Sequence, residues 1–405
     1  MKEIEFSTMN ITPSAGIGDT FFDAFTARHQ VKVKPFYMDW GEAWNQLVRF
    51  ALNSRGADVS EVGTTWLGGL HAMDALRPFT PGETTLLGGE QCYPPAIWQA
   101  CHIGRNNLML AIPLVLDMRM VLYRRDWLQK AGADEATAFA DPGQFSETLK
   151  QIKVAGHPAP LGLATSQSDT RPIHDAACWV WSAGGELRSD DEHRMMLMES
   201  QGRAGMQAYF GLNEFLSPEM QALTESEVFN AFFAGKTAVA ILPERTYLEV
   251  VLNRSNVSAK VVDNVGMAML MQAPYIGGSA LAIWRYSSDY QDSLKLIQYL
   301  TDMEIWQVLN KQHLPYTPAH LDALKQAPLA SIPFYPAVQK TIRDGRSFHS
   351  GYRWSRVEAR LVAVIEQMWG DLRANPELNI EREVGQRFSS VCNRLEQTIL
   401  ASSSF

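Results

Sequence analysis

The sequence lacks the features that a nucleic-acid surface or a membrane span requires. Its 405 residues carry 36 Lys and Arg against 44 Asp and Glu, a formal net charge of −8, without a basic cluster. We therefore expect no nucleic-acid partner, since such surfaces carry a basic excess or stripe. The longest apolar run, Leu108–Leu116, is too short to span a bilayer and contains Pro113. No leader-like segment precedes the strand-like "EIEFSTM", so we expect either an intracellular protein or one whose leader has been removed.

Cysteines are few and widely spaced. None of the four belongs to a C-x-x-C pair, and their spacing is unlike that of a zinc site: Cys92, Cys101, Cys178 and Cys392. We expect neither a metal nor a cofactor. A disulfide between Cys92 and Cys101 stays open, but packing thiols are favoured because free cysteine behaves as a small hydrophobe.

Motifs for catalysis are also missing. The chain has no G-x-S-x-G, no H-E-x-x-H and no G-x-G-x-x-G, because "GIGDTF" ends in Phe21. The Gly-Lys-Thr at Gly235 lacks the upstream glycine of a phosphate loop, since Asn230 stands there. Asp117 and Glu244 are separated carboxylates of the kind a glycoside hydrolase needs, so that alternative is kept behind the prediction that the protein is not an enzyme.

The segment "NAFFAGKTAVAILPER" is the most informative one present. Gly235 is suited to ending a helix in the left-handed conformation, and Thr237–Leu242 is a short apolar run typical of a buried strand. Glu244 and Arg245 then follow the carboxyl end of that strand. Ligands bind at this edge in open α/β sheets, so the pair is a candidate site.

Strand-like and helix-like segments alternate through the first part of the chain. The order is "IEFSTM", the helical "DTFFDAFTARH" with Asp19 as a cap, "VKVKPFYM", the helical "EAWNQLVRFALNS" and "ADVSEVG". This β-α-β-α-β order predicts an α/β fold with mostly parallel sheets and helices on both faces. Near the other end, Val357–Leu372 and Val384–Leu395 carry apolar stripes that predict two packed helices.

A succession of segments resembles the solute-binding proteins of bacterial ABC importers, in the carbohydrate-binding group that includes maltose-binding protein. The segments run from "VKVKPFYMDWGEAWNQLVRFALNSRGADVSEVGTTWLGGLHAMDALRPF" through "IPLVLDMRMVLYRRDWLQKAG", "WSAGGE", "FNAFFAGKTAVAI" and "IGGSALAIW" to "LPYTPAH". The resemblance covers nearly the whole chain in the family's order. It implies a periplasmic-binding-protein-like fold, in which two lobes are joined by a multi-segment hinge and close around a small ligand.

The resemblance also implies where the lobes divide. Hinge segments are expected near Ile112–Leu114, Pro274–Ile276 and Pro315–Thr317. The amino-terminal lobe is then residues 1–112 plus 275–315, and the carboxy-terminal lobe is residues 113–274 plus 316–405.

Position by position, the resemblance implies a ligand site drawn from both lobes. Expected contacts are Thr65, Trp66, Asp117, Arg119, Arg171, His174, Glu244, Arg245, Gly278, Ser279 and Trp354. Carboxylates accept hydrogen bonds from several hydroxyls, and Trp66 and Trp354 are expected to stack on a sugar. Arg245 falls where maltose-binding protein has a stacking tryptophan, which favours a small, polar or acidic ligand over a long glucan. Taken alone, each of these residues is as readily explained by core packing, a turn or an ion pair.

The implied function is the capture of a small carbohydrate or sugar derivative, without chemistry, for a bacterial ABC transporter. We expect a monomer that works in the periplasm or otherwise outside the cytoplasm and hands its ligand to a permease. One alternative is a sensing module of the same fold that signals in the cytoplasm or to a membrane receptor. The other is the glycoside hydrolase.

Overall fold

The computed structural model describes residues 1–9, 21–104, 106–166, 172–189, 191–253, 257, 259–311, 316–349, 351 and 353–401. The expected helix cap at Asp19 lies outside these residues. The chain forms two compact units, each of three segments. Unit 1 comprises Met1–Asp117, Gly277–Ala330 and Ser347–Ser355, and unit 2 comprises Met118–Ile276, Ser331–Arg346 and Arg356–Phe405.

The boundaries of the units differ from the predicted lobe boundaries. The chain first passes from unit 1 to unit 2 after Asp117, later than the predicted segment Ile112–Leu114. It returns to unit 1 after Ile276. Around the third predicted hinge, strand β12 (Thr317–Pro318) pairs antiparallel with Leu116 and Val115, so this stretch packs in unit 1. The other part of that prediction, Pro315, lies outside the described residues.

Unit 1 is a sheet with helices on both faces. Strands β1 (Lys2–Met9) and β2 (Val31–Met38) are parallel, as are β1 and β3 (Val59–Gly63). Strand β11 (Ile276–Trp284) runs antiparallel to β3, and β4 (Leu76–Arg77) runs antiparallel to β11. A separate antiparallel pair is β5 (His102–Ile103) and β6 (Leu108–Met109).

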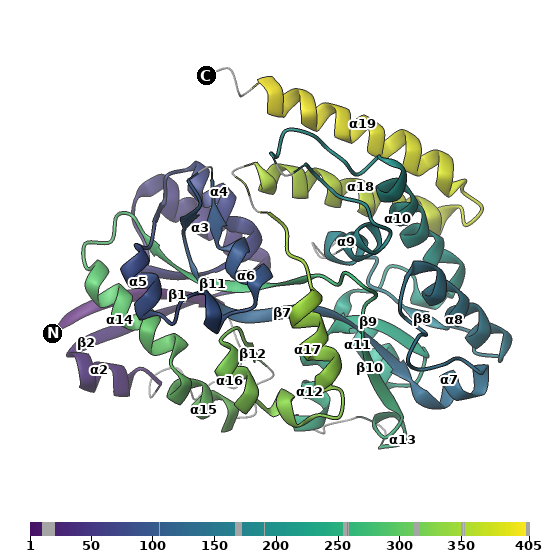
Figure 1. Ribbon diagram of the computed structural model, residues 1–405, viewed down its shortest axis with the longest axis horizontal. Coiled ribbons are helices and arrows are strands. Elements are labelled where there is room, and N and C mark those ends of the chain that lie inside the picture. The colour runs from purple at the N-terminus through teal and green to yellow at the C-terminus, as the bar shows by residue number, and fades with distance from the viewer. Residues whose placement is uncertain are drawn as a thin grey trace. The chain divides into compact units, whose positions relative to one another are not determined.

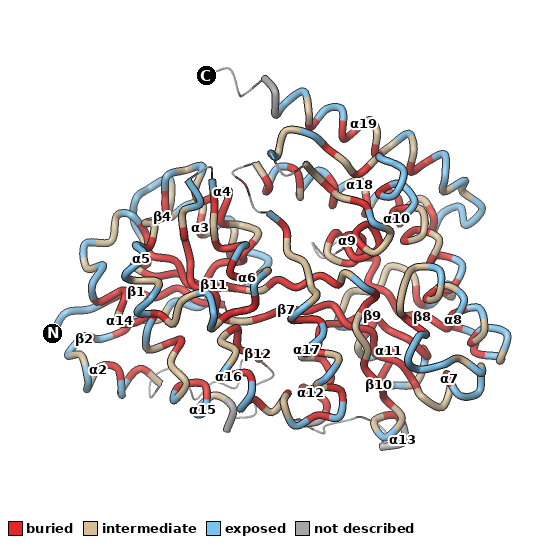
Figure 2. Tube along the Cα trace, viewed as in Figure 1, coloured by how far each residue is buried: buried red, intermediate tan, exposed pale blue. Residues whose placement is uncertain are grey.

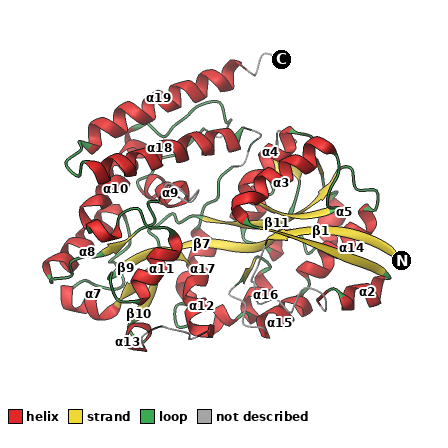
Figure 3. Cartoon of the chain, turned by 180° about the vertical axis from the view of Figure 1, so that it is seen from behind, coloured by secondary structure: helices red, strands yellow, loops and turns green. Residues whose placement is uncertain are grey.

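The helices of unit 1 lie on two sides of its sheet (Figure 1). On one side lie α3 (Trp40–Asn53) and α4 (Leu67–Ala72). The short helices α5 (Pro81–Leu86) and α6 (Pro95–Ala100) belong to the same unit. On the other side lie α2 (Asp23–His29), α14 (Tyr290–Thr301), α15 (Met303–Lys311) and α16 (Leu321–Gln326). The view from behind gives the same two layers (Figure 3).

Unit 2 has its own strands. The long strand β7 (Ile112–Arg124) begins in unit 1, and its second half pairs antiparallel with β9 (Val239–Pro243) and β10 (Val265–Met269). Strand β8 (Leu161–Gly162) is parallel to β9. The helices of this unit are α7 (Arg125–Ala131), α8 (Pro142–Val154), α9 (Pro172–Ser182), α10 (Ser200–Gly211), α11 (Glu225–Phe233), α12 (Arg245–Asn253), α13 (Ala259–Val262), α17 (Tyr335–Asp344), α18 (Trp354–Ala374) and α19 (Ile380–Ala401). The start of α18, through Ser355, belongs to unit 1.

The α/β fold class is confirmed, but the pairing is mixed rather than mostly parallel. The prediction used the amino-terminal alternation, where helices join successive strands, and there the pairing is parallel. Strands β7 and β11 are not connected to their neighbours in this way, and they pair antiparallel with β9 and β3. Buried residues follow these strands (Figure 2), so β3 and β9 are buried along their whole length.

Candidate ligand-binding site

The most informative segment of the sequence forms the expected helix, stop and strand in unit 2. Thr224 caps α11 with a reciprocal capping box to Glu227, and Gly235 follows the helix with φ +75°, in the left-handed region. Strand β9 then runs through the interior and ends at Pro243. The next two residues, Glu244 and Arg245, therefore stand at the carboxyl end of a buried strand, as predicted.

Glu244 fixes the end of β9 to β7. Its side chain is fully buried, and Oε2 accepts a hydrogen bond from the backbone N–H of Met118 at 2.8 Å. The backbone N–H of Glu244 donates to the carbonyl oxygen of Met118 at 3.2 Å. Because both groups bind the same residue, this glutamate holds two strands together.

Arg119, a predicted ligand contact, lies in the interior of unit 2, where it is ion-paired. It is 2% exposed. Its Nε lies 3.2 Å from Oδ1 of Asp175 on α9, and an Nη atom lies 2.7 Å from Oε2 of Glu225, the first residue of α11. Buried charges are tolerated when they are paired, and these pairs connect β7 to two helices.

Glu225 also faces Arg245. Its Oε1 lies 3.6 Å from the Arg245 guanidinium, whose side chain is 31% exposed. One carboxylate thus stands between a buried arginine and a partly exposed one. Glu225 also sits at a helix N-terminus, where a negative charge is favoured. An acidic ligand at Arg245 would compete with Glu225, whereas a hydroxyl would add to the same hydrogen-bonding set.

His174 is the other predicted residue of unit 2 that the structure describes. Its ring stacks on Tyr275, with centroids 4.2 Å apart and planes 12° apart. Its Nε2 lies 3.9 Å from Oε1 of Glu358. Half-buried and backed by an aromatic face, the imidazole has a defined orientation. Arg171, predicted beside it, lies outside the described residues.

In unit 1 the predicted residues Thr65 and Trp66 follow the end of a strand at one edge of the sheet. Because β1 is parallel to both β2 and β3, their carboxyl ends at Met9, Met38 and Gly63 share that edge. A short 3-10 helix, Thr64–Trp66, comes directly after β3, and its Thr65 and Trp66 are half-buried. This is the position at which open α/β sheets bind ligands.

Glu61 joins two of these strand ends. Buried within β3, its Oε2 accepts hydrogen bonds from Thr8 Oγ1 at 2.5 Å and from the backbone N–H of Met9 at 2.9 Å. The charge is therefore used to hold β1 against β3. This glutamate was not among the predicted site residues, because its only signal in the sequence is a carboxylate in an otherwise strand-like run.

Gly278 and Ser279 lie on β11 beside the same edge. Ser279 is buried and stands opposite Gly63 in register. Gly278 has φ +143°, and a Cβ there would come within 1.9 Å of the Val115 carbonyl oxygen, so the position requires glycine. Asp117, half-buried on β7, is the last residue of the first segment of unit 1, Met1–Asp117.

Trp354 has a core environment in place of the exposed platform expected. It is 2% exposed, and its ring stacks on Phe348 with centroids 4.6 Å apart. Both residues belong to unit 1. One face of the indole is therefore already covered by a phenyl ring.

The four cysteines are free thiols, as favoured from the sequence. Burial raises the pKa of the Cys101 and Cys178 thiols well above the ordinary value. Among the described residues, no group of three or more His, Cys, Asp or Glu side chains is placed to hold a metal ion. In the same part of the chain, no helix combines the length and apolar character needed to cross a membrane.

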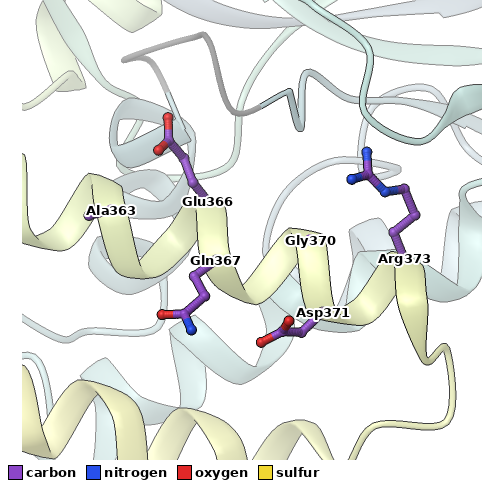
Figure 4. Close-up of a pocket in the computed structure, with 6 residues that line it drawn as sticks. All are labelled: Ala363, Glu366, Gln367, Gly370, Asp371 and Arg373. Atoms are coloured by element: carbon purple, nitrogen blue, oxygen red, sulfur yellow. The ribbon is translucent and has the colours of Figure 1, made fainter.

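A polar pocket on unit 2 contains none of the predicted site residues. The lining residues that the structure describes all come from α18 (Figure 4): Ala363, Glu366, Gln367, Gly370, Asp371 and Arg373. Of these, Asp371 pairs with Arg387 of α19 at 2.5 Å. The described residues that line this pocket include no aromatic side chain, and we assign it no part in binding.

Comparison with known proteins identifies the family. The family model of bacterial extracellular solute-binding proteins matches residues 20–337, which is most of the chain. The chain belongs to this family. A curated relative is the probable ABC transporter-binding protein of Deinococcus radiodurans, which is 25% identical over 260 residues. That match spans 60% of this chain and 58% of the relative.

Solved structures share the fold over nearly the whole chain. The sugar-binding protein MalE from Xanthomonas citri has a TM-score of 0.80 at 18% identity, with 99% of this chain and 98% of that chain covered. An ABC transporter solute-binding protein from Thermotoga lettingae, bound with α-D-tagatose, has a TM-score of 0.79 at 16% identity, with coverage of 98% and 100%. Maltose-bound MalE3 from T. maritima gives the same TM-score, identity and coverage. These likenesses confirm the periplasmic-binding-protein-like fold.

Proposed function

We propose that the protein captures a small carbohydrate or sugar derivative and releases it unaltered to the permease of an ABC transporter, outside the cytoplasm. Membership of the extracellular solute-binding family across residues 20–337 is the observation that carries the proposal. The sugar-binding structures with the same fold support the choice of ligand class. The protein is proposed to act as a monomer and without a cofactor.

Each unit supplies a different kind of contact in this proposal. In unit 1, Trp66 offers an apolar ring beside the hydroxyl of Thr65, and both are half-buried. A sugar has the same two characters, apolar C–H faces and hydroxyl edges, and ligand sites combine aromatic walls with a few polar groups. Asp117 is proposed to accept hydrogen bonds from ligand hydroxyls.

In unit 2, Arg245 and His174 are the proposed polar contacts. Both side chains are partly exposed, and each is oriented by a neighbour, Arg245 by Glu225 and His174 by Tyr275. Glu244 and Arg119 are buried and are proposed to position these groups. A ligand that both units contact is proposed to favour a closed arrangement, because it binds that arrangement more tightly than the open one.

A thermal-shift screen tests the proposal directly. A ligand that binds only the folded protein raises the melting temperature, by an amount that grows with its concentration above Kd. The panel contains monosaccharides, disaccharides, polyols, sugar acids and sugar phosphates, and hits are confirmed by calorimetry. Binding of a sugar that is recovered intact by chromatography supports the proposal. Recovery of a hydrolysed sugar, or no binding across the panel, contradicts it.

A further inference from the structure

Trp40 is an exposed tryptophan at the same sheet edge as Trp66. It is 44% exposed and is the first residue of α3, two residues after the end of β2 at Met38. Other tryptophans, such as Trp179 and Trp284, are 1% and 0% exposed. Exposed apolar side chains mark a contact site when they form a patch, whereas a single one is ordinary, so the neighbours of Trp40 decide its meaning.

Trp40 and Trp44 both contact Trp66. The centroid of the Trp40 ring lies 5.4 Å from that of Trp66, and the two planes are tilted by 57°. The Trp44 centroid lies 6.0 Å from Trp66, with a tilt of 51°. We call these three residues the tryptophan cluster. It lies entirely within unit 1.

Two glycines make room for the inner rings of the cluster. A Cβ at Gly63 would lie 3.2 Å from the Trp66 ring, and a Cβ at Gly69 would lie 2.7 Å from the end of the Trp44 ring. The backbone of β3 and α4 therefore approaches these two indoles closely, and they are held by packing. Helices α3 and α4, which carry Trp44 and Gly69, lie side by side in both ribbon views (Figures 1 and 3).

We propose that Trp40 is a second stacking platform beside Trp66, and that the ligand therefore contains at least two linked sugar rings. This inference rests on the proposed function. Two indole faces tilted by 57° do not both lie flat against one sugar ring, so each face takes a ring of its own. Trp44 backs Trp66 and sets its orientation rather than touching the ligand.

Calorimetric titration with sugars of one and two rings tests the inference. The probes are glucose, galactose and fructose against maltose, cellobiose, lactose, sucrose and trehalose. Trp40→Ala is expected to weaken disaccharide binding about tenfold. Binding of any monosaccharide is expected to change by less than about twofold. Trp40→Phe, which keeps an aromatic face, is expected to restore most of the lost affinity.

Two further variants separate binding from structure. Leu52→Ala removes another exposed apolar side chain of α3, which is 74% exposed, and should leave all affinities unchanged. Trp44→Ala should lower the melting temperature and weaken both sugar classes, because the support of Trp66 is lost. Equal weakening of both classes by Trp40→Ala, or no weakening, overturns the inference while sugar binding itself stands. Absence of binding to every probe by the unmodified protein contradicts the proposed function and removes this inference with it.

Discussion

The carboxylate of Glu244 accepts a hydrogen bond at 2.8 Å from the backbone amide of Met118, which lies 126 residues earlier in the chain. The contact is buried, and it fixes the end of β9 against β7 next to the buried pairs of Arg119. Arg245 begins the following helix. The position of the partly exposed Arg245 therefore depends on a glutamate that no ligand needs to touch.

Replacing Glu244 should lower the stability of the fold. Glu244→Ala leaves the Met118 N–H buried without its acceptor, so the free energy of unfolding should fall by about 1–3 kcal/mol or more. Glu244→Gln keeps an amide oxygen at the same place and should cost less. Urea denaturation of the two variants measures the difference. If the Gln variant is as unstable as the Ala variant, the hydrogen bond to Met118 is not the source of the stability.

Glu225→Gln should change which sugars bind at Arg245. Glu225 is the carboxylate that faces both Arg245 and Arg119, and the variant keeps its shape but removes its charge. Affinity for sugar acids such as glucuronate should rise several-fold relative to the matching neutral sugar. The gain should shrink at high salt, because exposed charges are screened. Calorimetry at two salt concentrations measures the gain in affinity and its dependence on salt.

Glu227→Gln is the matched control for this variant. It removes the same charge from the same helix, but Glu227 serves the capping box with Thr224, a role that glutamine also fills. The preference between acidic and neutral sugars should not change. An equal change in both variants would mean that net charge, rather than the position of Glu225, controls selectivity.

Gly278→Ala should destabilise unit 1 severely. The residue has φ +143°, and the added Cβ would meet the Val115 carbonyl oxygen at 1.9 Å, so β11 and β7 would have to separate. A loss of more than about 1 kcal/mol is expected for alanine in such a conformation. Gly82→Ala, where a Cβ meets open space, is the control and should stay within about 1 kcal/mol of the unmodified protein. Equal melting temperatures for the two variants would contradict the conclusion that position 278 requires glycine.

Local patterns predicted the elements well because their causes are local. The end of α11, the glycine at φ +75° and the buried strand β9 follow from neighbouring residues, and so do β2 and α3. The charges at the carboxyl end of β9 were also predictable, since an apolar run that stops at charged residues marks a surface or a buried pair.

The partners of those charges could not be predicted. Arg119 pairs with Glu225, which is 106 residues away in the chain, and ordinary sequence spacing contains no signal for such a contact. Trp40, by contrast, could have been found: it follows the strand "VKVKPFYM" by two residues, at the edge where ligands bind. The parallel order of β2, β1 and β3 was needed to place it beside Trp66.

Buried His157 should make unit 2 less stable in weak acid. Its Nδ1 accepts a hydrogen bond from the Ala159 N–H at 3.2 Å, and its ring packs edge-on against Trp127 at 4.5 Å. Burial, and next the positive charge of Arg124, lower the pKa of the imidazole from its ordinary value of 6.5. The unfolded chain therefore binds a proton more readily than the folded one. The contribution of His157 to stability is complete above pH 6.5 and is lost as the pH falls toward the lowered folded pKa.

His157→Gln tests this by removing the titrating group while keeping a polar side chain. Urea unfolding at several pH values between about 8 and about 5 should show the unmodified protein losing stability more steeply than the variant. The free energy of unfolding of the variant should still fall somewhat with pH, because burial also lowers the pKa of His320. The stability of the variant at high pH measures the structural cost of the substitution separately, so it does not enter the comparison of slopes. Parallel curves across the whole range would show that His157 takes up its proton equally in both states, and the structural reason for its lowered pKa would then be wrong.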